Sequence, residues 1–147
     1  MVARLPVEQQ LAAFREVLGR NETLVEVLNR AAALGLPGWY LTAGCLFQTV
    51  WNVVTGRASA QGIRDYDVFY YDGSDLGWAA EDEVIRRGRT LFGDLPVEIR
   101  NEARVHLWYE DHFGVPCPPY PSSEAAIDSF AATTCCLGVR LEPAQCV

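Results

Sequence analysis

Residues 63–71 constrain the fold most strongly, because polar and aromatic residues alternate along this segment. Successive side chains of a β-strand point to opposite faces of its sheet. Tyr66 and Val68 would then pack inward, whereas Asp65 and Asp67 would lie together on the other face. The alternation therefore predicts a strand with one buried face and one acidic face.

Asp65 and Asp67 are the first candidate site residues. Two neighbouring carboxylates repel each other unless a cation lies between them or one of them is protonated. Magnesium prefers such oxygen ligands, usually one or two carboxylates together with water and substrate phosphate. The pair therefore predicts a Mg²⁺ or Mn²⁺ site for a phosphate ester. The alternative is an acidic, solvated sheet face, which the pair by itself leaves open.

A glycine at a predicted strand-to-helix turn gives a second group of candidates. Residues 39–42 form a short apolar run, and apolar residues then recur at spacings of three and four through 45–55, which predicts a strand followed by a helix. Gly44 at the turn would let backbone amides approach a ligand, and the helix start would present free N–H groups to an anion. Gly44 and Cys45 are therefore candidate phosphate-binding residues. A purely steric role for the glycine is the alternative.

Glu98 is the third acidic candidate. Residues 96–100 predict a short strand, with Val97 and Ile99 on one face and Glu98 on the other. If this strand lies beside 63–71, three carboxylates converge, as two-metal phosphoryl transfer requires. The alternative is a surface carboxylate paired with a nearby arginine.

Arg100 and Arg104 lie four residues apart, a spacing that would let them share a helix face near the carboxylates, and Asn101 is a good N-cap residue for the helix predicted over 101–112. The guanidinium fork binds phosphate oxygens bidentately, so both arginines are candidate nucleotide-binding residues. Alternatively, Arg104 merely neutralises a neighbouring carboxylate such as Glu98.

Three blocks of the chain, 43–52, 63–72 and 98–109, are similar in order to the small bacterial nucleotidyltransferase-like family formerly catalogued as a domain of unknown function. Residues 118–127 and 133–141 also fit the pattern of that family. The resemblance runs from about residue 39 to residue 141 and covers most of the chain.

The resemblance implies the nucleotidyltransferase superfamily fold, an α/β (α+β) architecture with a mixed β-sheet flanked by helices. Gly44 and Cys45 match the phosphate turn of the family, Asp65 and Asp67 match its metal-binding pair, and Glu98 matches its third catalytic acid. The implied function is magnesium-dependent transfer of a nucleoside monophosphate from a nucleoside triphosphate to an unidentified acceptor. The alternative is a catalytically inactive nucleotide-binding or interaction domain of the same fold.

Two departures from the family pattern matter. Cys45 stands where better-known superfamily members have serine or glycine, so no hydroxyl is available there for phosphate. Family members also continue beyond the segment 133–141, so we expect this chain to be truncated at its C-terminus. An uncovered apolar sheet edge favours pairing with a second chain, so we expect self-association through this edge.

Length and charge bound the remaining alternatives. With 147 residues the chain forms one predicted domain, 1–147, made of an N-terminal helical segment, 1–36, and a catalytic-type core, 37–141. The net charge of −7 argues against general nucleic-acid binding. No long apolar run and no signal peptide is visible in the sequence, so we expect a cytoplasmic protein with no membrane partner. The five cysteines contain no Cys-x-x-Cys pair, so we expect them to be reduced thiols.

The hydrophobic spacing predicts one mixed sheet covered by helices. The predicted helices are 7–18, 23–33, 45–55, 81–91, 101–112 and 123–129, and the predicted strands are 39–42, 63–71, 96–100 and 134–141.

Overall fold

The computed structural model describes residues 4–129 and 137–141. Its elements, in chain order, are α1 (Val7–Gly19), α2 (Glu22–Leu34), β1 (Tyr40–Thr42), α3 (Gly44–Val54), β2 (Tyr66–Tyr70), α4 (Trp78–Phe92), β3 (Val97–Asn101), the 3₁₀ turn η2 (Glu102–Arg104), α5 (Val105–Phe113), α6 (Ser123–Asp128) and β4 (Gly138–Val139).

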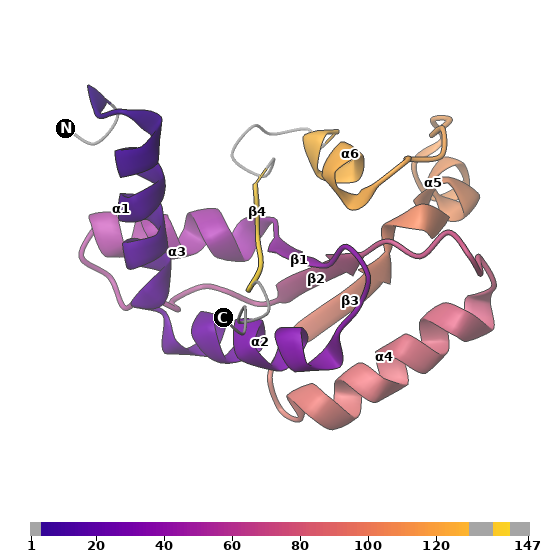
Figure 1. The fold of residues 1–147 in the computed structure, drawn as a ribbon, viewed down its shortest axis with the longest axis horizontal. Coiled ribbons are helices and arrows are strands. Elements are labelled where there is room, and N and C mark those ends of the chain that lie inside the picture. Colours follow the sequence, from indigo (N-terminus) through magenta and orange to yellow (C-terminus); the bar gives the residue numbers. More distant parts are fainter. Residues whose placement is uncertain (1–3, 130–136, 142–147) are drawn as a thin grey trace, which may run out of the picture.

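The strands form one mixed sheet in the order β3-β2-β1-β4. β2 and β3 are parallel and are joined by α4, which supplies the long crossover that parallel neighbours need. β1 is antiparallel to both β2 and β4. Helices flank this sheet (Figure 1), so the predicted fold class is confirmed.

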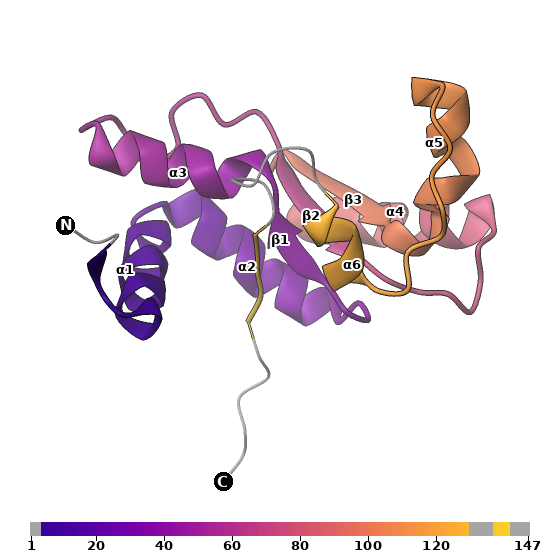
Figure 2. The ribbon, with the colours of Figure 1, turned by 90° about the horizontal axis from the view of Figure 1, so that it is seen from above.

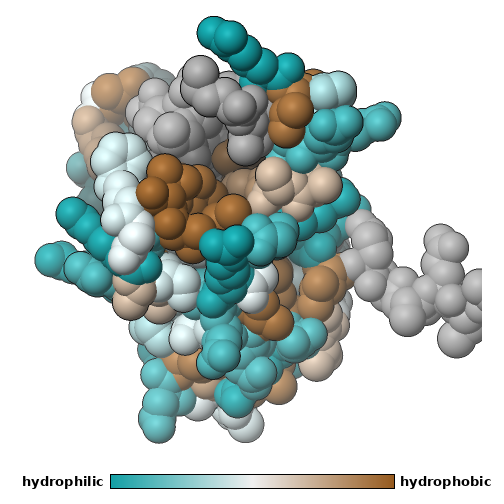
Figure 3. Space-filling view, turned by 90° about the vertical axis from the view of Figure 1, so that its left-hand side faces the viewer, coloured by the Kyte–Doolittle hydropathy of each residue, from teal (hydrophilic) through white to brown (hydrophobic). Residues whose placement is uncertain are grey.

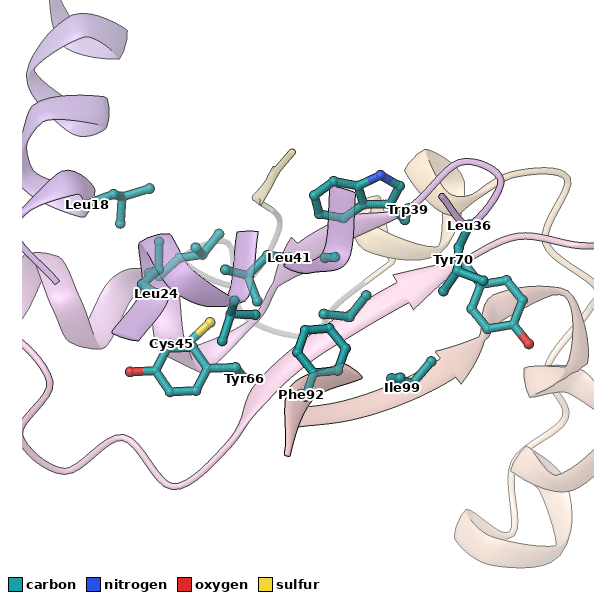
Figure 4. Packing of buried hydrophobic residues seen from close by; sticks show 14 residues of the cluster. Leu18, Leu24, Leu36, Trp39, Leu41, Cys45, Tyr66, Tyr70, Phe92 and Ile99 are labelled. Atoms are coloured by element: carbon teal, nitrogen blue, oxygen red, sulfur yellow. The ribbon is translucent and has the colours of Figure 1, made fainter. Parts of the chain in front are cut away.

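The core lies between α2, α4 and one face of the sheet. Tyr66, Val68 and Ile99 point to this face and are buried, as the alternation along β2 and β3 predicts. They pack with side chains such as Phe92 from α4 and Leu24 from α2 (Figure 4). The opposite face of β2 therefore carries the acidic residues away from the core.

β2 is shorter than the predicted strand 63–71. Its first residue is Tyr66, because the chain before it is held as a loop by Asn52, whose side-chain amide donates to the backbone oxygens of Ser59 (3.0 Å) and Gln61 (2.7 Å). Asp65 consequently lies just outside the strand. Hydrophobic spacing carries no information about this side-chain contact, so the strand boundary was predicted too early.

Two further predictions of secondary structure need correction. The helix predicted over 101–112 is divided, because Asn101 ends β3 and its side chain accepts a hydrogen bond from the backbone N–H of Ala103 within η2 before α5 begins. Arg100 therefore lies on a strand and Arg104 on a 3₁₀ turn, and they share no helix face. Of the strand predicted over 134–141, only β4 is observed, and residues 134–136 lie outside the described residues.

The remaining helices lie around the ends and the acidic face of the sheet. Seen from above, α5 stands at one end of the molecule and α1 at the other, with α6 between α5 and β1 (Figure 2). On the side of the molecule shown in Figure 3, apolar side chains form patches among hydrophilic ones. None of the helices within residues 4–129 and 137–141 is both long and apolar enough to cross a membrane.

Candidate nucleotidyl-transfer site

Asp67 and Glu98 lie directly opposite each other in the parallel pairing of β2 and β3. Both therefore project from the sheet face that is turned away from the core. The pKa of Asp67 is raised from 3.8 to about 6, chiefly by partial burial and then by the negative charges of Glu98 and Asp65, whereas Arg100 opposes the shift. The parallel register thus brings together two of the three predicted acidic residues.

Asp65 lies beside this pair but outside the sheet, and its side chain is exposed. Its charge acts on Asp67, which places it near the pair. Within the described part of the chain, no group of three or more His, Cys, Asp or Glu side chains is close enough to hold a metal ion. The residues still fit Mg²⁺, because two repelling carboxylates are hard oxygen donors, and this ion usually takes only one or two carboxylates with water and phosphate as its other ligands.

The turn before α3 presents backbone amides beside these carboxylates. Ala43 adopts a positive φ of 68°, which is uncommon for a residue other than glycine. No side chain caps the helix, so the N–H groups at its start stay available to an anion. Gly44 begins the helix as the sequence indicates, whereas the strained Ala43 is a feature that the sequence pattern did not reveal.

The Cys45 side chain is turned into the core, where its thiol donates to the backbone oxygen of Thr42 at 3.4 Å (Figure 4). Burial raises the pKa of this thiol to about 12, so it stays protonated at neutral pH. Any contact of Cys45 with phosphate must therefore come from its backbone amide. The lack of a hydroxyl at this position therefore has less bearing on phosphate binding than the replacement of serine by cysteine implies.

A shallow pocket of about 280 Å³ lies between the start of α3 and the acidic loop. Gly44, Arg64, Asp65 and Asp67 line it. Sequence reasoning missed Arg64, although it precedes the acidic pair directly. Its exposed guanidinium supplies positive charge where the helix start and the carboxylates meet.

The two arginines predicted to bind nucleotide have different surroundings. Arg100 follows Glu98 on the same face of β3, and its guanidinium lies 5.3 Å from the centre of the Trp108 ring. Arg104 instead donates to Glu81 at 2.6 Å and to the backbone oxygen of Leu76 at 2.9 Å. Arg104 thus joins η2 to the start of α4, and the structure does not bring it to the carboxylates.

A second pocket, of about 380 Å³, lies on the other side of Asp67. It extends past Glu98 and Arg100 to Glu102, which is 4% exposed. Burial raises the pKa of Glu102 to about 7, while Arg100 opposes the shift. No sequence pattern indicated a role for this residue, because a glutamate at the start of a predicted helix is ordinarily solvated.

Comparisons with known proteins agree with this geometry. A family model described as nucleotidyltransferase matches residues 29–147, and the chain belongs to that family. The resemblance inferred from the sequence blocks is therefore confirmed. The family is named for nucleotidyl transfer.

One solved structure shares the fold. It is an NMR structure of a protein described as revealing a CCA-adding enzyme head domain, with a TM-score of 0.69 and 24% sequence identity. The match covers 92% of this chain but only 65% of that protein, so the likeness concerns the fold. No curated protein gives a significant match.

Proposed function

We propose that this protein is a magnesium- or manganese-dependent nucleotidyltransferase that transfers a nucleoside monophosphate from a nucleoside triphosphate to a hydroxyl-bearing acceptor. The observation that carries the proposal is the direct pairing of Asp67 with Glu98 across β2 and β3, beside the uncapped start of α3. The raised pKa of Asp67 supports it, because a cation between these carboxylates would relieve their repulsion.

Each residue has a distinct role in the proposed reaction. Asp65 and Asp67 would hold a metal ion, and Glu98 would help to hold a second ion. When bound, the metal neutralises charge on the phosphates and on the leaving pyrophosphate. The acceptor oxygen forms a bond to the α-phosphorus, the bond from this phosphorus to pyrophosphate breaks, and Glu98 accepts the proton of the acceptor hydroxyl.

Backbone amides and arginines would bind the triphosphate. The N–H groups of Gly44 and Cys45 at the start of α3 attract its oxygens, as helix N-termini commonly do. Arg64 and Arg100 lie on either side of Asp67 and would offset the charge that develops on the phosphates. Arg104 is left out of this assignment, because Glu81 already engages it.

An inactive nucleotide-binding domain of the same fold is the alternative. It is favoured by the exposed position of Asp65 and by the lack of a close group of three ligands within the described residues. The two functions differ in a single measurable product, since only the enzyme releases pyrophosphate.

The test is a binding and turnover screen with the four nucleoside triphosphates, with and without Mg²⁺. We expect metal-dependent nucleotide binding, and pyrophosphate release when an acceptor is supplied from a mixture of small molecules, proteins and RNA ends. Asp67→Asn should abolish both, while Asp94→Asn, which changes an exposed aspartate in the loop before β3, should leave both intact. Metal-dependent binding without pyrophosphate release supports the inactive alternative, and absence of metal-dependent binding overturns both.

A further inference from the structure

Glu102, the buried glutamate directly after β3, lines the second pocket and gives it a preference for hydrogen-bond donors. We propose that this pocket, called the base pocket, holds a guanine-type ring whose adjacent N–H groups donate to the carboxylate of Glu102. The base pocket is the space of about 380 Å³ lined by Asp67, Arg100, Glu102, Trp108 and Tyr109, together with residues of α6. The inference rests on the proposed function, because it supplies a binding site for a base beside the transfer site.

Glu102 is a buried acid whose carboxylate has no hydrogen-bond partner among residues 4–129 and 137–141. Its side chain is 4% exposed, and its carboxylate makes no hydrogen bond to the part of the chain that the structure describes. A buried carboxylate in this state is costly, and a ligand that donates to it removes the cost. Arg100 supplies a compensating charge nearby but leaves the hydrogen-bonding capacity of Glu102 unused.

The backbone around Glu102 is held firmly in place. Asn101, immediately before it, exchanges hydrogen bonds with the backbone of Asp72 at 3.1 and 3.0 Å and also accepts from the N–H of Ala103 at 3.0 Å. The backbone N–H of Asn101 donates to Glu81 at 2.9 Å. These contacts fix the turn, so Glu102 is set at the pocket by rigid structure rather than by a free loop.

Aromatic rings form the walls of the base pocket. Trp108 and Tyr109 come from α5, Phe69 from β2, and Tyr120 from the segment before α6. Trp108 also lies against the Arg100 guanidinium. Such flat, amphipathic walls hold planar bases by stacking, and the volume falls in the usual range for ligand pockets, roughly 300–1,000 Å³.

The acceptor-only chemistry of a carboxylate selects among the bases. Above its pKa of about 7, for example at pH 8, Glu102 is mostly ionised, and its carboxylate then accepts hydrogen bonds and donates none. Guanine presents two adjacent N–H donors on one edge, whereas the corresponding edges of adenine, cytosine and uracil each place an acceptor beside their donor. Guanine is therefore the base that can donate two hydrogen bonds to Glu102 without placing an acceptor against its carboxylate.

The base pocket adjoins the transfer site, since Asp67, Glu98 and Arg100 line its inner end. A ring in this pocket would belong either to the nucleoside triphosphate or to the acceptor, and the chemistry of recognition is the same for both. Two arms of one experiment separate these sources.

Both arms are run at pH 8, where Glu102 is mostly ionised. In the first arm, equilibrium binding of GTP, ATP, CTP and UTP is measured with Mg²⁺, using quenching of tryptophan fluorescence. In the second arm, guanosine and adenosine are titrated into protein saturated with Mg²⁺ and a non-hydrolysable triphosphate. We expect a preference for guanine of about tenfold or more in one arm, because hydrogen bonds to charged groups are the stronger ones. The arm that shows the preference identifies the source of the ring.

Glu102→Gln should remove this preference, because the N–H group of the introduced amide would face the N–H donors of guanine. Glu110→Gln, on the exposed side of α5, is the control and should keep the preference. We expect Glu102→Gln to fold, since it replaces a buried acid with a neutral side chain. Trp108→Leu is the second variant and should weaken all bases by about tenfold through lost stacking.

Equal binding of all bases in both arms, or a guanine preference that survives Glu102→Gln, overturns the base pocket. Metal-dependent triphosphate binding in that case would leave the proposed function standing, so failure of the two inferences can be told apart.

Discussion

Replacing Asp67 with asparagine should stabilise the metal-free protein at neutral and alkaline pH. The pKa of Asp67 is raised from 3.8 to about 6, chiefly by burial and then by the charges of Glu98 and Asp65. The folded protein therefore binds this proton more tightly than the unfolded chain does. Consequently the free energy of unfolding falls as pH rises from about 4 to about 6 and then becomes level.

The magnitude follows from the size of the shift. A difference of about two pKa units corresponds to about 3 kcal/mol at most, because each unit is worth about 1.4 kcal/mol. Asp67 is only partly buried, and solvent screens its interactions, so about 1–2 kcal/mol is the realistic penalty. Asp67→Asn should recover this amount at pH 8 and almost none of it near pH 4.

Urea unfolding followed by tryptophan fluorescence at pH 4, 6 and 8 measures the effect, and Asp94→Asn is the matched control. Mg²⁺ at ten times its dissociation constant should stabilise the wild type by about 1.4 kcal/mol and leave Asp67→Asn unchanged. A variant that is less stable than wild type at pH 8, or a difference that does not vary with pH, would refute the electrostatic argument.

The other predictions concern the neighbouring elements. Glu98→Gln should eliminate pyrophosphate release with little change in the urea midpoint, and turnover within a few-fold of wild type would remove Glu98 from the mechanism. Arg104→Met should lower the free energy of unfolding by about 2–4 kcal/mol, because it removes the positive charge that compensates Glu81, whose side chain is only 16% exposed, and nucleotide affinity measured on the folded variant should be retained. Gly88→Ala should cost about 1–3 kcal/mol despite the better helix propensity of alanine, since the added Cβ would overlap Cδ1 of the buried Ile99, and an unchanged melting temperature would contradict this. Exposed leucines flank β4 at the sheet edge, so light scattering at about 100 μM should detect self-association, and a clean monomer would argue against it.

The sequence determined the parts of the fold that follow from local periodicity. Alternation along β2 correctly separated Tyr66 and Val68 from the acidic face, because the strand period depends only on backbone geometry. The glycine at the strand-to-helix turn likewise predicted the start of α3. The ordered sequence blocks were sufficient to recognise the family.

Contacts between distant segments were decided by the tertiary structure alone. The parallel register that sets Asp67 opposite Glu98 depends on the crossover through α4, and local spacing does not encode it. The pairing of Arg104 with Glu81 arises in the same way, because it joins residues 23 positions apart. Glu102 looks like an ordinary surface acid in the sequence, and only the packing of η2 against α5 and α6 encloses it in the pocket that Asp67 and Glu98 also line, since burial is a property of the assembled chain.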